Sequence, residues 1–491
     1  ALGANTTGTS NTAVGSLALD ANTTANNNTA IGRKALTTNQ TGATNTAVGV
    51  QALEDCTGSD NTAVGGFAGL EITSGVKNSA LGYAACGSVT TGTDNVGIGY
   101  NGCGQVTTGT GNVGIGRNTL NTSNTASHNI AIGYTALAST TGAENIAIGK
   151  EAMVANSSGA NNVAIGTDAL KSNTTGNNNV AVGRQALDAQ TTGQYNVAVG
   201  HGALSAATTA LQNVGVGISS LLNTTTGGIN AACGNNTLQE NTTGTQNTAM
   251  GSGALISNTT GSQLTAVGAN ALSSFVSGTT QLTAVGFDAL KLCTAAYNTA
   301  VGWQAGDAIT TGQANVMVGD GSLGANETGG HNVAVGHFAL NNTTGDNNTG
   351  IGSNAIRSNT TGGQNTSVGK SALTANTTGL RNTAIGREAL QANTTASQNT
   401  AVGSGAMAAN TTGYSHTAVG HGALDTQNGG YACGAFGVDA LKSCTTGVNN
   451  QAFGFNALAA VTTGSHNVAM GVAAGQSITT GNGNVCIGYT A

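Results

Sequence analysis

Apolar and polar residues recur along this chain with a period of seventeen residues. The repeating unit is N-[TV]-A-[VI]-G-x-x-A-L-x-x-N-T-T-G-x-x, first complete from Asn11 and still legible at Asn484. We number its residues as repeat positions 1 to 17, and position 1 occurs 29 times. The step between starts deviates by one residue at five places: it is 16 before Asn61, Asn145, Asn298 and Asn348, and 18 before Leu282. A fixed short period predicts stacked units rather than one globular core.

Positions 1 to 5 alternate in the manner of a strand, and seventeen residues are too few for a helix-turn-helix unit. Position 4 is always apolar and position 2 is mostly Thr, Val or Ile, so we expect both to face the core, with the small residue at position 3 facing away. Position 5 is always Gly, from Gly15 to Gly488, which predicts a corner with positive φ or close backbone approach. N-T-T-G predicts a second turn.

The sequence therefore predicts an all-β fold, a parallel β-solenoid or β-roll of about 29 seventeen-residue coils, each with two short strands and two corners. Residues 1–491 are expected to form a single continuous repeat region. One coil cannot fold alone, because the entropy of ordering its backbone exceeds what burying one Val and one Leu offsets. Asn is present at position 1 in 25 of 29 repeats, and stacked Asn amides are expected to bond along the axis as a ladder.

Positions 9 and 12 vary together, which predicts that they share one small interior. Leu is usual at position 9, and in the five repeats where Gly or Cys replaces it the usual Asn at position 12 becomes Ile or Val. Close packing accounts for this exchange, because an unfilled Leu-sized hole is costly. The five pairs are Gly69 with Ile72, Cys86 with Val89, Cys103 with Val106, Gly306 with Ile309, and Gly475 with Ile478.

Two faces of the coil are candidates for contact with other molecules. Position 6 is the most variable and is expected to form a solvent-facing ridge, either a solvated edge or a weak multivalent contact ridge for glycans or a partner. The unbroken small residues of position 3 suggest that another backbone lies against them in a homo-oligomer, unless a narrow coil admits only Ala on both faces. The predicted contact ridge comprises Tyr83, Tyr100, Tyr134, His201, Phe287, Trp303, His337, His421, Phe455 and Tyr489.

Composition excludes some classes of function. Charged residues are 7% of the chain and the net charge is −6, which excludes a basic groove for nucleic acid and a polybasic membrane patch. No stretch approaches the ~18 apolar residues of a membrane-spanning helix. The chain opens and closes within a repeat, so we expect a fragment of a longer fibre protein and draw nothing from the lack of a targeting signal.

The eight cysteines fall inside the repeat pattern, which favours small buried residues over a disulfide framework. A bridge between Cys86 and Cys103, at the same position of neighbouring coils, is the alternative, since stacked Cα atoms lie within disulfide range. The other cysteines are Cys56, Cys293 and Cys444 at position 12, Cys233 at position 4, Cys433 at position 1 and Cys486 at position 3.

No pattern indicates catalysis. The seven histidines are scattered, and we find no nucleophile–base pair, no paired carboxylates and no CxxC spacing. Glycine runs such as Gly97-Ile98-Gly99 lack the strand–loop–helix context of a phosphate loop. We therefore expect no catalytic residue, no cofactor and no metal, and a protein that is not an enzyme.

The N-T-A-V-G and N-V-A-I-G runs, for example Asn162-Val163-Ala164-Ile165-Gly166, resemble the head repeats of YadA-like trimeric autotransporter adhesins. The longer form N-T-T-G-x-x-N-T-A-[VI]-G-x-x-A-L is similar to repeats of phage tail-fibre-domain proteins and related bacterial surface proteins. The resemblance covers essentially the whole chain, although the adhesin period is shorter. It implies a left-handed parallel β-roll and a homotrimer.

Pattern and resemblance together favour a structural and adhesive fibre shaft, on a phage tail or a bacterial cell surface, and hence an extracellular location. Its expected partners are itself and a cell-surface glycan or receptor, with no nucleic acid and no membrane insertion. The alternative is an ice-binding β-solenoid, suggested by low charge and by Thr at positions 13 and 14, although adjacent strand residues point to opposite sides. A polysaccharide lyase would need a cluster of acids and bases, which the sequence lacks.

Overall fold

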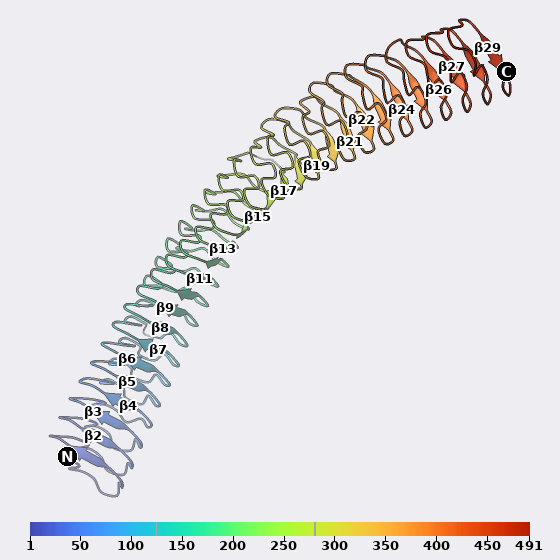
Figure 1. The fold of residues 1–491 in the computed structure, drawn as a ribbon. Helices are drawn as coiled ribbons and strands as arrows, with labels where there is room; N and C mark the ends of the chain where they lie inside the picture. Colours follow the sequence, from blue (N-terminus) through green and yellow to red (C-terminus); the bar gives the residue numbers. More distant parts are fainter. Residues whose placement is uncertain (124, 279–280) are drawn as a thin grey trace. The chain divides into compact units, whose positions relative to one another are not determined.

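The computed structural model describes residues 1–123, 125–278 and 281–491, and within these ranges every strand has three residues and there is no helix. The chain divides into two compact units, Ala1–Asn247 and Thr248–Ala491. Each unit is an all-β parallel β-solenoid whose strands recur at the period of the sequence repeat (Figure 1). The predicted fold class is confirmed.

The first unit contains strands β1 to β14, one for each repeat. Their bounds are β1 Thr12–Val14, β2 Thr29–Ile31, β3 Thr46–Val48, β4 Thr62–Val64, β5 Ser79–Leu81, β6 Val96–Ile98, β7 Val113–Ile115, β8 Ile130–Ile132, β9 Ile146–Ile148, β10 Val163–Ile165, β11 Val180–Val182, β12 Val197–Val199, β13 Val214–Val216 and β14 Ala231–Cys233.

The second unit contains β15 to β29. Their bounds are β15 Thr248–Met250, β16 Thr265–Val267, β17 Thr283–Val285, β18 Thr299–Val301, β19 Val316–Val318, β20 Val333–Val335, β21 Thr349–Ile351, β22 Thr366–Val368, β23 Thr383–Ile385, β24 Thr400–Val402, β25 Thr417–Val419, β26 Gly434–Phe436, β27 Gln451–Phe453, β28 Val468–Met470 and β29 Val485–Ile487.

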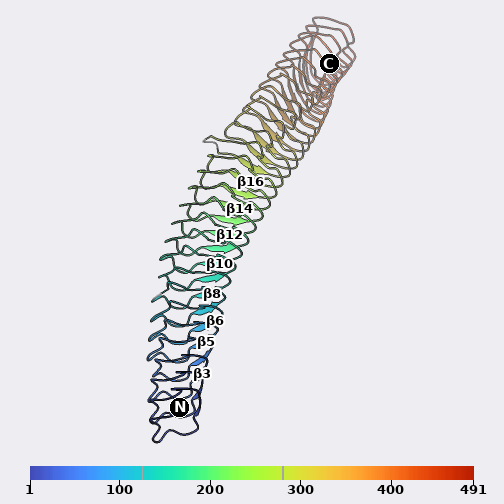
Figure 2. The ribbon, with the colours of Figure 1, turned by 90° about the vertical axis from the view of Figure 1, so that its left-hand side faces the viewer.

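Strands within a unit are parallel and in register, displaced by one repeat. Ala164 at the centre of β10 pairs with Ala147 of β9 and with Ala181 of β11. The same pairing joins β15 to β16 and continues to β29 in the second unit. The strand arrows of each unit therefore lie in a row along its coils (Figure 2). Equivalent residues of successive repeats become neighbours in space.

The strand faces are the reverse of those expected from the sequence. Ala164 at position 3 is fully buried, whereas Ile165 at position 4 is 38% exposed and Val163 at position 2 is partly exposed. The reason is the narrow interior: a Cβ added at Gly97, also at position 3, would lie 2.6 Å from the Gly102 carbonyl oxygen across the coil. A small side chain fits there, and the one large exception, Met317, is buried beside Gly306, where the preceding coil lacks its Leu. Because position 3 is buried, the prediction that it contacts another chain is wrong.

Each coil in the described ranges has one strand, so the predicted second strand is wrong. In the coil of residues 162–178, Asp168, Leu170 and Asn178 have φ of 59°, 49° and 58°. Residues in this left-handed region break a strand and cost about 1–2 kcal/mol each. Stacking maintains them, because the Asp168 N–H donates to the Lys150 carbonyl and the Leu170 N–H to the Ala186 carbonyl, in the two neighbouring coils.

The Gly at position 5 satisfies both conditions that the sequence suggested. Gly166 has φ of 137°, and a Cβ added to it would lie 2.5 Å from the carbonyl oxygen of Gly183 in the next coil. No other residue tolerates both the backbone angle and the contact. The corner is thus set by how closely successive coils approach.

Buried asparagines form the predicted ladder at position 1. The Asn162 N–H donates to Oδ1 of Asn145 at 3.0 Å, and its Nδ2 donates across the coil to the Gly176 carbonyl at 2.9 Å. Asn173, at position 12, donates to Oδ1 of Asn156 at 2.9 Å and shares the Gly176 carbonyl at 3.1 Å. Because a buried amide is costly without partners, these two rows fix the register of the stack.

Both asparagine rows are replaced by apolar residues around the eighteen-residue repeat that precedes Leu282. Leu264 and Leu282 occupy position 1 in successive coils, and Phe275 occupies position 12 between them; all three are buried. A Cβ added at Gly261 would meet Phe275 Cε1 at 2.5 Å and Leu264 Cδ1 at 3.1 Å. Apolar side chains thus fill the volume of the amides. Replacing all members of a buried polar set costs less than removing one of them.

The predicted exchange between positions 9 and 12 is confirmed in the interior. Ile72 is fully buried, and its Cδ1 lies 3.0 Å from where a Cβ of Gly69 would stand, beside Leu53 Cδ2 at 2.8 Å. Ile309 and Ile478 lie in the same way beside Gly306 and Gly475. The branched side chain therefore fills the space that a Leu leaves.

The reversed strand faces can be tested with one pair of variants. We expect Ala164→Leu to lower the local opening free energy by about 1–3 kcal/mol because it overpacks a full interior. Val163→Leu, which adds one methylene on the partly exposed side, is expected to change it by less than about 0.5 kcal/mol. Amide hydrogen exchange of peptides covering residues 150–190 measures both, and equal effects would contradict the assignment.

The exchange between positions 9 and 12 predicts a non-additive pair. Gly69→Leu overpacks the space held by Ile72, and Ile72→Asn leaves a hole, so each is expected to destabilise by about 1–3 kcal/mol. The double variant restores the common Leu–Asn pair and is expected to recover about 1–3 kcal/mol of the summed loss. Hydrogen exchange of residues 55–90 gives the cycle; strictly additive losses would show that the two positions do not share a volume.

Candidate functional site

The predicted contact ridge lies at the corner that follows each strand. Its ten residues all occupy position 6, directly after the Gly of position 5, and all are exposed. Exposure is largest for Tyr489 at 79% and is 50% for Trp303. The ridge is therefore available for contact, while its role in binding stays a prediction.

Four residues of the ridge and one neighbour form a continuous set in the first unit. The rings of Tyr83 and Tyr100 stack at 5.5 Å between centroids, and Phe67 meets Tyr83 edge-on at 5.5 Å. The guanidinium of Arg117 lies 5.5 Å from the Tyr100 ring centre and 6.0 Å from that of Tyr134. A cation within about 6 Å of an aromatic face is attracted to it. Successive coils thus hold five side chains in contact.

The second unit brings fewer of the predicted residues together. His337 lies 4.1 Å from the ring of Phe338, and its Nε2 is 3.7 Å from the carboxylate of Asp320. Arg357 lies over Phe338 at 5.0 Å. Phe287, Trp303, His421, Phe455 and Tyr489 are spread over separate coils.

Sequence reasoning missed the exposed face of the strands. Positions 2 and 4 point outward, and from β6 to β13 both are Val or Ile in every strand. Val214 and Val199 remain 42% and 36% exposed. In the second unit Phe436 and Phe453 stack on this face at 4.8 Å. Runs of β-branched residues at both positions were the available signal, but the sequence analysis had assigned them to the core.

Threonine replaces Val at position 2 in other blocks, from β1 to β4, from β15 to β18 and from β21 to β25. Within the described residues the hydroxyls of Thr366, Thr383 and Thr400 have no protein partner. At position 13, by contrast, the hydroxyls bond between coils: Thr174 Oγ1 donates to the Thr191 carbonyl at 3.0 Å. The threonines on which the ice-binding alternative rested are therefore partly used inside the stack.

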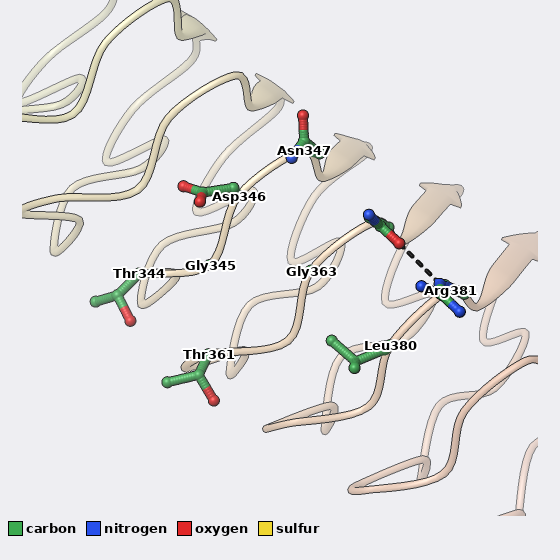
Figure 3. A pocket seen from close by; sticks show the side chains of 9 residues that line it. Thr344, Gly345, Asp346, Asn347, Thr361, Gly363, Leu380 and Arg381 are labelled. Atoms are coloured by element: carbon green, nitrogen blue, oxygen red, sulfur yellow. Dashed lines mark hydrogen bonds between the residues drawn. The ribbon is translucent and has the colours of Figure 1, made fainter.

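A shallow hollow of about 420 Å³ opens at the N-T-T-G corner, beside a coil one residue shorter than usual (Figure 3). Its charged groups have partners: Asp346 Oδ1 accepts the Gly330 N–H at 2.8 Å, and Arg381 Nε donates to Gln364 Oε1 at 2.8 Å. The remaining lining is mostly Thr and Gly. This hollow contains no nucleophile beside a base.

All eight cysteines are free thiols. Cys86 and Cys103 contact each other unbridged, and the neighbouring Cys86 thiol together with burial raises the pKa of Cys103. Burial raises the pKa of Cys56 to about 11. The most exposed thiol is Cys233, on the outer face of β14.

One interior cluster departs from the asparagine rows. His416 and Cys433 occupy position 1 of successive coils, and the Cys433 N–H donates to His416 Nδ1 at 3.2 Å. A thiol hydrogen bond from Cys444, with the imidazole beside it, lowers the pKa of Cys433. The three side chains are at most 2% exposed. The cluster is enclosed by the coils.

Among the described residues, no three His, Cys, Asp or Glu side chains are grouped so as to hold a metal ion. The same ranges contain no helix with the length and apolar character needed to cross a membrane.

Comparison with known proteins gives no family for this chain. No model of a known protein family matches the sequence, and no curated protein matches it.

Proposed function

We propose that this protein is a non-enzymatic structural and adhesive fibre shaft, part of a phage tail fibre or a bacterial surface adhesin, that acts outside the cell as a homotrimer. The observation that supports the proposal is the exposed strand face from β6 to β13, on which every outward side chain is Val or Ile. The resemblance to trimeric autotransporter heads and tail-fibre repeats supports the choice of three copies.

The strand face supports self-association on physical grounds. Parallel sheets are usually covered on both sides, and in the first unit only the inner side is covered. Contiguous exposed apolar surface on a soluble chain marks an interaction site. From β6 to β13 the face carries no charge that would repel an identical copy, and its β-branched side chains present a regular surface. The partner surface is thus the strand face, instead of the position 3 stripe.

The interior supports a mechanical role. In the described residues, successive coils bond through backbone groups, and most of them also bond through one or two buried amide rows. Such a stack transmits load along its length without a separate core in each repeat. The ridge of position 6 then remains free to meet a cell-surface glycan or receptor.

Self-association is tested by Val180→Lys, which places a charge at the centre of the β6–β13 face. The native 47.4 kDa chain is expected to sediment as three copies and the variant mainly as one, because burying an unpaired charge is unfavourable. Thr175→Lys, at an exposed corner, is the matched control and should leave the trimer intact. A native protein that sediments as a monomer would overturn the proposal.

The reactivity of Cys233 gives an independent measure of assembly in the same samples. Its thiol lies on the outer face of β14, so assembly should slow its reaction with a thiol reagent, and Val180→Lys should restore the rate.

An ice-binding role is the second candidate, favoured by one observation. From β21 to β25 the strand face presents Thr at position 2 and Val or Ile at position 4 in every strand, which is a regular array with unpartnered hydroxyls. This candidate predicts thermal hysteresis that Thr383→Lys reduces at least twofold, by breaking the array, while Thr378→Lys at a corner leaves it unchanged. A monomer with hysteresis would favour this role over the fibre shaft; a trimer without it would exclude it.

A further inference from the structure

Cations recur on every second coil along one stretch of the ridge. Between residues 83 and 201, position 6 carries aromatic, cationic or neutral polar side chains and no carboxylate, and every one of them is exposed. The cations Arg117, Lys150 and Arg184 alternate with uncharged residues. The eight residues in order are Tyr83, Tyr100, Arg117, Tyr134, Lys150, Thr167, Arg184 and His201.

The stacking of the coils sets the distance between these cations. Neighbouring strands lie about 4.8 Å apart, and the Tyr83 and Tyr100 rings are 5.5 Å apart at the corner. Two coils therefore place successive cations roughly 10 Å apart in a row. A sugar ring in an extended polysaccharide advances by a length similar to one coil, so a disaccharide matches two.

Most of this positive charge is available to a ligand. Within the described residues, no carboxylate oxygen lies within 4.0 Å of Arg117 or Arg184, which form none of the ion pairs. Lys150 lies 3.5 Å from Glu151, but Lys171 holds that carboxylate more closely, at 2.7 Å. Lys171 also binds Asp168 at 3.0 Å. Lys171 is thus shared by two carboxylates and Lys150 is partly paired with one of them, whereas the charges of Arg117 and Arg184 are unpaired among the described residues.

The aromatic side chains indicate which class of polymer the ridge binds. Tyr100 is packed between Tyr83 and Arg117, but all three tyrosines remain about half exposed. Their exposed ring edges and hydroxyls offer apolar contact and hydrogen bonds to sugar rings. Arg117 is held between two of these rings, which presents its guanidinium in a defined place for a carboxylate. A single-stranded nucleic acid carries a negative charge on every nucleotide, whereas the cations of this ridge occur on every second coil, a pattern that favours a polymer charged on every second unit.

We propose that the ridge from Tyr83 to His201 binds an acidic polysaccharide that carries one carboxylate per disaccharide and runs along the coils. The proposal rests on the adhesive role proposed above and names the chemistry of its ligand. Sugars with the carboxylate contact Arg117, Lys150 and Arg184, and the neutral sugars between them lie against Tyr134 and Thr167.

The test measures binding of the full chain to labelled ten-sugar oligosaccharides by fluorescence anisotropy. The probes are an alternating glucuronate–N-acetylglucosamine chain, a neutral N-acetylglucosamine chain and a uniformly charged galacturonate chain, with oligo-dT as the nucleic acid. We expect the alternating chain to bind at least fivefold more tightly than the others, and its affinity to fall as salt is raised.

Variants locate the site. Arg117→Gln and Tyr100→Ala are each expected to weaken binding about tenfold, the loss of one good contact. Arg381→Gln and Tyr195→Ala remove the same residue types from exposed places at position 17, outside the ridge, and should change affinity less than twofold. Equal binding of the neutral chain, tighter binding of oligo-dT, or equal effects of ridge and control variants would overturn the inference.

Sedimentation of the same samples separates this inference from the proposed function. A trimer that binds none of the oligosaccharides would overturn the polysaccharide inference and leave the fibre shaft standing. A monomeric protein that binds the alternating oligosaccharide would support the polysaccharide inference and overturn the proposed homotrimer.

Discussion

Backbone hydrogen bonds set the spacing between successive coils, and the rest of this structure depends on that spacing. Each coil donates to and accepts from its neighbours through the strand, the corners and the left-handed residues, and the buried asparagines repeat the same spacing with their amides. A coil alone buries too little to offset the ordering of its backbone. Only a stack of coils is therefore stable, and each repeat must place its backbone donors and acceptors level with those of its neighbours.

This constraint explains which positions are free to vary. Position 5 must be Gly because the next coil's carbonyl occupies the space of a side chain. Position 3 is small because the opposite wall lies against the strand, except at Met317, which fills the space left beside Gly306. Position 12 also varies while position 1 stays Asn, as at Ile72, but where Leu264 and Leu282 replace the position 1 amides, Phe275 at position 12 is apolar as well. Position 6 faces solvent and carries the most varied residues, so charged and aromatic side chains are found there.

The same constraint gives the surfaces their chemistry. In-register stacking places one outward residue of each repeat in a row. A contact with a partner that is weak in a single coil is therefore repeated along the unit. The Val and Ile face from β6 to β13 and the alternating cations beside Tyr100 and Tyr134 are two such rows. Multivalent contacts of this kind gain affinity from repetition rather than from any one pocket. The shallow hollow near Asp346 and Arg381 lacks this repetition.

The sequence by itself determined the period, the parallel stack, the Gly corner, the position 1 amide row and the exchange between Gly69 and Ile72, because each follows from residue type at a fixed spacing. It did not determine which strand face is inside. Alternation shows that Val163 and Ile165 share a side, but the side depends on the width of the coil, which is set by the opposite wall at Ala169 and Leu170. Only the tertiary structure decided that Ala164 is buried, that the β-branched face is open, and that Arg117 lies between two tyrosine rings. Those facts depend on how the chain closes each coil and on residues seventeen apart meeting in space, and alternation along a strand encodes neither.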